Sequence, residues 1–277
     1  MNSPDIPAGY ILTVATIIIF TGIYLCINQL QIIDPEGRFG WIVNNMLTII
    51  TASIFLIASI AGASRIKDLD AFGCSVMTVC ALSFLIAEVV WVWYDVFFGI
   101  DVPYPSTADM FYIIGTIALF ISIYTVAQGI SRNDQMTIWL LLFGIAVMIL
   151  VAYAYMRFTD MLDTTIDFKT FLSLLYPALD VACLIMLINL LIKRIRTPMK
   201  EAVVIMMIAT SLLLIGDVYF AITESLSVYY AGSMPDLLYS LSYALMAIGV
   251  VRCSYFEWLE ALKHKQICGV LQSTCNG

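Results

Sequence analysis

Charged residues are scarce in this sequence. Asp, Glu, Lys and Arg make up only 12% of its 277 residues, whereas a soluble domain carries about 25%. Hydrophobic residues account for 62%, and the mean hydropathy is +0.96. This composition excludes a soluble globular enzyme, a disordered chain and a nucleic-acid-binding protein. It leaves a multi-pass membrane protein embedded in a lipid bilayer.

Residues and motifs typical of catalytic, metal-binding and cofactor-binding sites are scarce as well. The only histidine is His264, and we find no complete catalytic, metal-binding or cofactor-binding motif. A membrane enzyme would lack a nucleophile with its base, so we expect no catalytic residue, no metal and no cofactor. The seven cysteines are an odd number and imply no disulfide framework. The first nine residues contain no Lys or Arg, unlike the basic start of a cleaved signal peptide.

Long apolar runs take up most of the chain. A helix that crosses the hydrocarbon core needs roughly 20 mostly apolar residues, and its backbone must be hydrogen-bonded internally. Eight such runs are found, at 9–30, 41–62, 73–98, 109–129, 137–156, 170–192, 202–222 and 236–254. We therefore predict an all-α polytopic membrane bundle of eight transmembrane helices.

Basic residues gather on one side of this eight-helix topology. Ten of the 13 fall in the loops and termini of that side: Arg65, Lys67, Arg132, Lys193, Arg194, Arg196, Lys200, Arg252, Lys263 and Lys265. Only Arg38, Arg157 and Lys169 fall on the other side. Because cytoplasmic loops carry the excess of Lys and Arg, we predict a cell-membrane protein with both termini in the cytoplasm.

Acidic residues show the opposite bias. Ten of them lie in the predicted outer loops and helix ends: Asp34, Glu36, Asp95, Asp101, Asp109, Asp160, Asp163, Asp167, Glu224 and Asp236. An electronegative outer face can concentrate a cationic ligand. The alternative is that these acids only keep the outer loops solvated.

Two parts of the chain repeat at nearly the same offset. The third run matches the seventh at an offset of 129 residues, which places Glu88 on Asp217. The motif S-x-x-D-x-x-Y opens the fourth and eighth runs at an offset of 127, as Ser106, Asp109 and Tyr112 and again as Ser233, Asp236 and Tyr239. We predict a parallel 4+4 repeat about an axis along the membrane normal. Its halves are 1–130 and 131–256, followed by a cytoplasmic tail at 257–277.

Three acids lie inside the predicted helices, at Glu88, Asp180 and Asp217. No Lys, Arg or His lies within the core of any predicted span. An unpaired carboxylate in hydrocarbon costs about 2.5 kcal/mol or more, and burial favours its neutral form. We expect all three acids to face the bundle interior in the outer half of the membrane. There they form a ligand or proton site, or they hydrogen-bond neighbouring helices.

Aromatic residues gather in the predicted outer half. Trp91 follows Glu88 on the third run, and Tyr112 and Tyr239 lie one turn into the fourth and eighth runs. We hypothesise that these aromatic residues and the three acids border one cavity that opens outward. The alternative is an aromatic belt at the membrane–water interface.

The repeated Ser and Asp residues have the spacing of a helix cap. In a capping box, a Ser hydroxyl and an acid three residues later satisfy backbone N–H groups at the start of a helix. Ser106 with Asp109 and Ser233 with Asp236 fit this pattern. Each acid would also meet the positive end of its helix dipole. We predict that these four residues are helix caps.

Two segments resemble parts of a known group of membrane regions. They are Pro103-Tyr104-Pro105-Ser106-Thr107-Ala108-Asp109-Met110-Phe111-Tyr112 and Tyr176-Pro177-Ala178-Leu179-Asp180. Both are similar to segments of the multi-helix membrane input regions that precede diguanylate cyclases and histidine kinases in bacteria and archaea. The resemblance implies a sensor whose output passes through a cytoplasmic signalling partner or a further part of the protein. Leu179 is a departure, because that position is often Gly in this group.

Two functions remain open from the sequence. The first is an integral membrane sensor or receptor-like module with a small-molecule pocket in the outer half of the membrane. The second is a proton- or cation-coupled small-molecule transporter that uses the three membrane acids. Transporters of duplicated fold often have interrupted helices at matching positions of the two halves. Pro177 has no counterpart in the first half, which counts against transport.

Overall fold

The computed structural model describes the chain as a set of α-helices. The described residues are 8–24, 38–64, 70–94, 104–130, 168–192, 197–226, 228–230 and 232–275. The helices in these ranges are α1 (Ala8–Tyr24), α2 (Arg38–Ala63), α3 (Asp70–Trp93), α4 (Thr107–Ile130), α6 (Phe168–Ile192), α7 (Thr197–Ser225) and α8 (Met234–Cys275).

Six of these helices are long and apolar enough to cross a membrane. The candidate spans are Val43–Ala63, Phe72–Trp93, Thr107–Ala127, Phe168–Ile192, Met199–Ser225 and Met234–Ser254. They coincide with six of the apolar runs found in the sequence. The fold is therefore an all-α multi-pass membrane bundle, as predicted.

The number of spans is corrected from eight to six candidates among the described residues. The first apolar run forms α1, which has 17 residues. Its described residues rise about 25 Å at 1.5 Å per residue, less than a hydrocarbon core of about 30 Å, so they are not among the candidate spans. The fifth predicted run, 137–156, lies outside the described residues.

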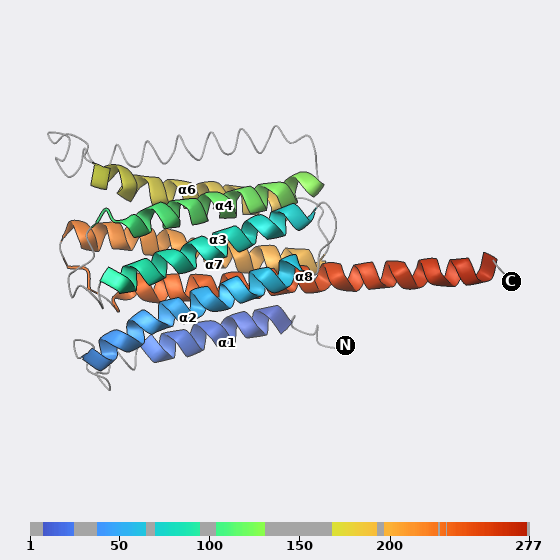
Figure 1. Cartoon of the computed structure of the whole chain (residues 1–277), viewed down its shortest axis with the longest axis horizontal. Helices are drawn as coiled ribbons and strands as arrows, with labels where there is room; N and C mark the ends of the chain where they lie inside the picture. The colour runs from blue at the N-terminus through green and yellow to red at the C-terminus, as the bar shows by residue number, and fades with distance from the viewer. Residues whose placement is uncertain are drawn as a thin grey trace.

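The six candidate spans form a closed ring. Helix α2 packs against α3, α3 against α4, α4 against α6, α6 against α7 and α7 against α8, and α8 packs against α2. Helix α1 lies outside this ring, against α8 and α7. It begins at the end of the bundle from which α8 projects (Figure 1). The opposite end, where α3 and α7 finish and α4 and α8 begin, is called the distal end below.

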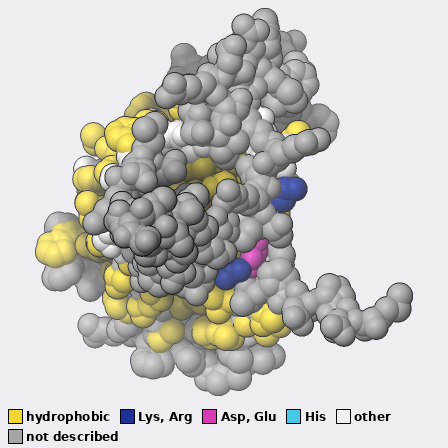
Figure 2. Space-filling view, turned by 90° about the vertical axis from the view of Figure 1, so that its right-hand side faces the viewer, with side chains coloured by type: hydrophobic (Ala, Val, Ile, Leu, Met, Phe, Trp, Pro, Cys, Tyr) yellow, Lys and Arg dark blue, Asp and Glu magenta, His cyan; other side chains and the backbone are white. Residues whose placement is uncertain are grey.

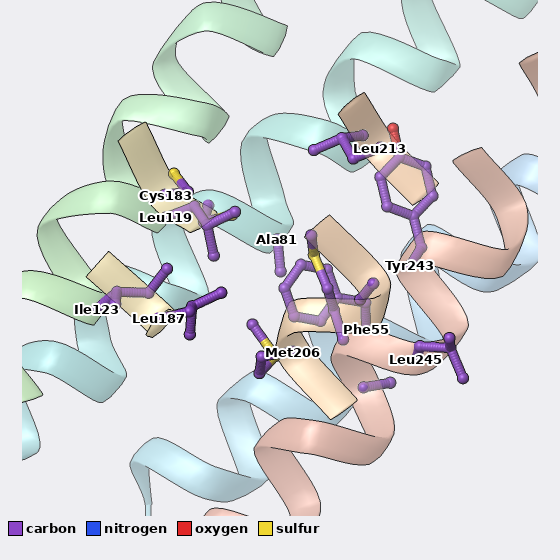
Figure 3. Packing of buried hydrophobic residues seen from close by; sticks show 14 of the residues in the cluster. Phe55, Ala81, Leu119, Ile123, Cys183, Leu187, Met206, Leu213, Tyr243 and Leu245 are labelled. Carbon is purple, nitrogen blue, oxygen red and sulfur yellow. The ribbon is translucent and has the colours of Figure 1, made fainter. Parts of the chain in front are cut away.

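A hydrophobic core fills the middle of the ring. Side chains from several helices converge there, among them Phe55, Leu119 and Met206 (Figure 3). Phe84 is 1% exposed, and its ring packs against the backbone of Gly115. A Cβ atom at Gly115 would lie 2.6 Å from two carbons of that ring. Such small residues let helices approach closely, which is how packing holds membrane helices together.

The outer surface of the bundle is strongly apolar. Large hydrophobic side chains are more than half exposed on several helices, including Ile18, Ile57 and Met110. Hydrophobic side chains also dominate the described surface seen from the end where α8 projects (Figure 2). A soluble monomer rarely exposes so much contiguous apolar surface. These side chains are therefore the ones that contact the lipid bilayer.

Candidate functional site

A cavity of about 60 Å³ lies inside the ring near the distal end. All six ring helices and the segments before α4 and α8 contribute to its wall. The lining residues are Asn44, Asn45, Thr48, Phe84, Glu88, Trp91, Tyr104, Asp109, Tyr112, Thr116, Ser173, Tyr176, Leu213, Asp217, Phe220, Ala221, Tyr229, Asp236, Tyr239 and Tyr243. Four of them are acids and six are tyrosines, and none is Lys, Arg or His.

Each of the four lining acids accepts a hydrogen bond from a tyrosine. The Tyr243 hydroxyl donates to Glu88 Oε1 at 2.8 Å, and the Tyr239 hydroxyl donates to Asp217 Oδ1 at 2.9 Å. Two similar pairs complete the set, Tyr176 with Asp109 Oδ1 at 2.7 Å and Tyr229 with Asp236 Oδ1 at 2.9 Å. These bonds join different helices in three of the pairs, so they fix the carboxyl groups around a common space.

Four aromatic rings form a second group in the cavity wall. Phe220 is at its centre, with ring centroids 4.9 Å from Tyr229, 5.3 Å from Tyr104 and 5.9 Å from Trp91. All three contacts are edge-to-face, the geometry that aromatic pairs favour. A cation is attracted to the faces of such rings.

Asp180 lies behind the cavity wall. It is fully buried and does not line the cavity. Its carboxyl group, on α6, pairs with the carboxyl group of Asp217 on α7. No hydroxyl, amide or amine of the described residues donates to either of its oxygens. Asp217 therefore has the Tyr239 hydroxyl on one side and the Asp180 carboxyl on another.

The first predicted cap has the geometry of a capping box. Helix α4 begins at Thr107, so Ser106 is the residue before the first turn. The Ser106 hydroxyl accepts a hydrogen bond from the Ala108 N–H at 3.2 Å. Asp109 Oδ2 accepts one from the Ser106 N–H at 2.5 Å. The same Asp109 side chain faces the cavity, so it caps α4 and contributes charge to the site.

The second predicted cap has a different geometry. Helix α8 begins at Met234, and Asp236 Oδ2 accepts a hydrogen bond from the Gly232 N–H at 2.5 Å. Gly232 has a φ of 91°, a left-handed conformation that glycine adopts without strain. The buried Ser233 hydroxyl has no hydrogen-bond partner among the described residues.

A lysine and a glutamate lie near the cavity without lining it. Lys169 Nζ and Glu224 Oε1 form an ion pair at 2.8 Å, and Lys169 Nζ also lies 5.6 Å from the centre of the Tyr104 ring. The Tyr104 hydroxyl is 3.1 Å from the Ser173 hydroxyl. Burial is the main reason that the pKa of Tyr104 is raised above its usual value. Tyr104 therefore keeps its proton at neutral pH.

The Lys169–Glu224 ion pair is expected to contribute little to stability. Both side chains are partly exposed, with 38% and 26% of their surface accessible, and exposed ion pairs contribute about 0–1 kcal/mol. Replacing Lys169 by Gln should lower the free energy of unfolding by less than about 1 kcal/mol. Unfolding of the purified protein in mixed micelles measures this change. A larger loss would mean that Lys169 contributes more than its exposed ion pair.

The structure brings most of the predicted site residues together. Glu88, Asp217, Trp91, Tyr112 and Tyr239 all line the one cavity, whereas Asp180 reaches it only through Asp217. Their predicted roles in binding a ligand or proton stay predictions.

Sequence reasoning missed several residues of the cavity wall. The most important are Tyr243, Tyr176 and Tyr229, which hydrogen-bond three of the four lining acids. One signal was available for Tyr243, since it follows Tyr239 by four residues and so shares its helix face. No sequence signal indicated the partner of Tyr229, because its bond depends on how the chain turns before α8.

A second cavity of about 80 Å³ lies inside the ring toward the other end of the bundle. Its lining is mostly apolar, with residues such as Met77, Leu187 and Val203. Along the helices, the lining residues of the two cavities are separated by a layer of fully buried apolar residues: Phe55, Cys80, Leu119, Ala209 and Met246. The ring therefore holds a polar cavity and an apolar cavity with a packed layer between them.

The fold and its apolar surface define the class of this protein, an all-α multi-pass integral membrane protein. No protein-family model, curated protein or solved structure matches the chain, so no family is identified. Within the described ranges, no group of three or more His, Cys, Asp or Glu side chains is arranged to hold a metal ion.

Proposed function

We propose that this protein is an integral membrane sensor or receptor-like module that binds a small organic cation in the distal cavity. The observation that carries the proposal is the composition of the cavity wall. Glu88, Asp109, Asp217 and Asp236 line it, and no described lining residue is basic. A bound cation would supply the positive charge that the wall lacks, in a site of low dielectric where that attraction is strong.

The aromatic group around Phe220 supports the same class of ligand. Four rings line the cavity beside the acids, and aromatic faces attract ammonium groups. The size of the cavity limits the ligand further. Its volume of about 60 Å³ equals the volume that about two water molecules occupy in the liquid. A primary ammonium ion with a short substituent, such as methylammonium, fits these limits.

Helix α8 supports a sensory role. It carries Tyr239 and Tyr243, which line the cavity, and it continues as one helix to Cys275. Beyond the candidate span that ends at Ser254, α8 projects from the bundle (Figure 1). A shift of α8 at the cavity would thus be carried along a single rigid element to a signalling partner. The resemblance of two segments to membrane input regions points to the same role.

In the proposed topology the chain has two halves, 1–130 and 131–256, followed by a tail at 257–277. The order of helices in the ring supports this repeat. Helices three places apart in the ring are α2 and α6, α3 and α7, and α4 and α8, which are the equivalent helices of the two predicted halves. A position of both termini in the cytoplasm is part of the proposal. The distribution of Lys and Arg supports this orientation, in which the distal end faces outward and the projecting part of α8 faces the cytoplasm.

A proton- or cation-coupled transporter is the second candidate. It is favoured by the second cavity, which lies in the same ring beyond the packed layer. A path across the membrane through this ring would join the two cavities. In this case the layer that contains Phe55 and Leu119 would open during transport.

Binding of methylammonium tests the proposed function. We expect methylammonium to raise the melting temperature of the wild-type protein in detergent, because a ligand that binds only the folded state stabilises it. Replacing Asp217 by Asn or Glu88 by Gln should weaken the affinity at least about tenfold, which corresponds to 1.4 kcal/mol. Methanol, a neutral molecule of similar size, should have no effect.

The matched control is Glu224→Gln, which removes a nearby carboxylate that does not line the cavity and should leave the affinity unchanged. Equal binding by wild type and the Asp217 variant would overturn the cation site. Uptake of labelled methylammonium into proteoliposomes separates the two functions. Binding without uptake supports a sensor, and uptake supports a transporter.

A further inference from the structure

Two carboxyl groups, those of Asp180 and Asp217, interact with each other inside the bundle. Asp180 is 0% exposed, and both of its oxygens lack a hydroxyl, amide or amine donor among the described residues. The group that pairs with it is a second carboxyl, that of Asp217. The two described ion pairs, Lys169 with Glu224 and Arg252 with Glu201, lie elsewhere.

Two carboxyl groups in contact cannot both be ionised without strong repulsion in a buried site. A hydrogen bond between them requires a proton on one of the two. The groups around the pair do not remove this requirement. Tyr239 on α8 donates to Asp217, Asp109 on α4 adds negative charge near Asp217, and Cys183 lies near Asp180 on α6.

We infer that Asp180 and Asp217 together bind one proton, and that a cation binding in the cavity at Asp217 displaces it. The displacement rests on the proposed function. In this exchange the carboxyl O–H bond breaks, the proton passes from Asp217 to water in the cavity, and the cation supplies the positive charge that is lost. The cavity thus exchanges one proton for one cation, and the net charge of the site does not change.

The exchange predicts the direction in which the affinity for the cation changes with pH. Because cation binding releases a proton, a lower pH opposes binding. Where one proton is released per cation, the affinity for methylammonium should fall tenfold for each unit by which the pH is lowered. Asp180→Asn removes this dependence, because an amide donates a hydrogen bond to Asp217 without binding or releasing a proton. Binding by that variant should be the same across the range in which wild-type binding changes.

Infrared spectroscopy tests the proton pair without any ligand. A protonated carboxyl group has a C=O stretching band that an ionised one lacks, and we expect this band in the wild-type protein at neutral pH. Asp180→Asn and Asp217→Asn should each remove the same band, and the double variant should remove no more. Glu224→Gln is the control and should keep it. If one variant does not fold, the other provides the result.

The outcomes test the shared proton and the proton–cation exchange separately. A band that survives in every folded variant of the pair would overturn the proton site. An Asp180→Asn protein whose methylammonium affinity keeps the pH dependence of wild type would overturn the exchange. If the band is lost as expected but methylammonium does not bind, the proposed function and the exchange are rejected and the proton pair stands.

Discussion

Replacing Arg252 by methionine is expected to destabilise the bundle by about 3–5 kcal/mol. The Arg252 guanidinium pairs with Glu201 Oε2 at 2.5 Å, and the Glu201 side chain is only 5% exposed. Without the arginine, Glu201 is left as a buried carboxylate with no partner of opposite charge among the described residues, which is the costly way to break a buried pair. The free energy of unfolding in mixed micelles measures the loss.

The companion variants identify the cause of that loss. Glu201→Met leaves Arg252, whose side chain is 27% exposed and can reach polar surroundings, so this change should cost less than Arg252→Met. The double variant removes both charges and should recover much of the stability. If the double variant is as unstable as Arg252→Met, the loss comes from packing of the arginine stem and not from the uncompensated carboxylate.

Replacing Phe84 by alanine is expected to cost about 3–5 kcal/mol. The Phe84 ring is fully packed between α4 and α8, with its centroid 5.4 Å from that of Tyr243 and 6.5 Å from that of Tyr112. It also forms part of the cavity wall. Its loss therefore removes dispersion contacts, among them the ring contact with Tyr243, the hydrogen-bond donor to Glu88. Unfolding measurements on the purified variant test this loss.

A size exchange with Gly115 shows whether the effect is steric. Gly115→Ala alone should destabilise the protein, because its Cβ atom would lie 2.6 Å from ring carbons of Phe84. Combined with Phe84→Leu, the added methyl group gains space, so the double variant should be more stable than the sum of the two single changes predicts. Simple additivity would show that the two positions do not pack against each other.

The helices could be predicted from the sequence because their signal is local. Runs of about 20 apolar residues have one stable form in lipid, and six of them coincide with candidate spans. The prediction of eight spans went further than the described structure supports. The run at 9–30 has the hydropathy of a span, but its described residues form a 17-residue helix, α1, that lies against the outside of the ring.

The acids of the site were also visible in the sequence. Glu88 and Asp217 stand out because a charge within an apolar run is expensive and rare. Tyr239, the partner of Asp217, was found through the repeated motif. The partner of Glu88 does not stand out, since a tyrosine near a helix end is equally typical of an interface belt. Tyr243 hydrogen-bonds Glu88 across 155 positions of sequence, and no local pattern predicts such a contact.

The sequence by itself determined the class of this protein, the positions of most of its spans and the acids that lie in them. Only the tertiary structure decided that six helices close into a ring, that four carboxyl groups share one cavity and that Asp180 pairs with Asp217. The physical reason is the solvent. In water an apolar stripe marks the buried face of a helix, but in lipid the buried and lipid-facing sides are both apolar. The rotation of each helix, and with it the site, is set by packing against its neighbours.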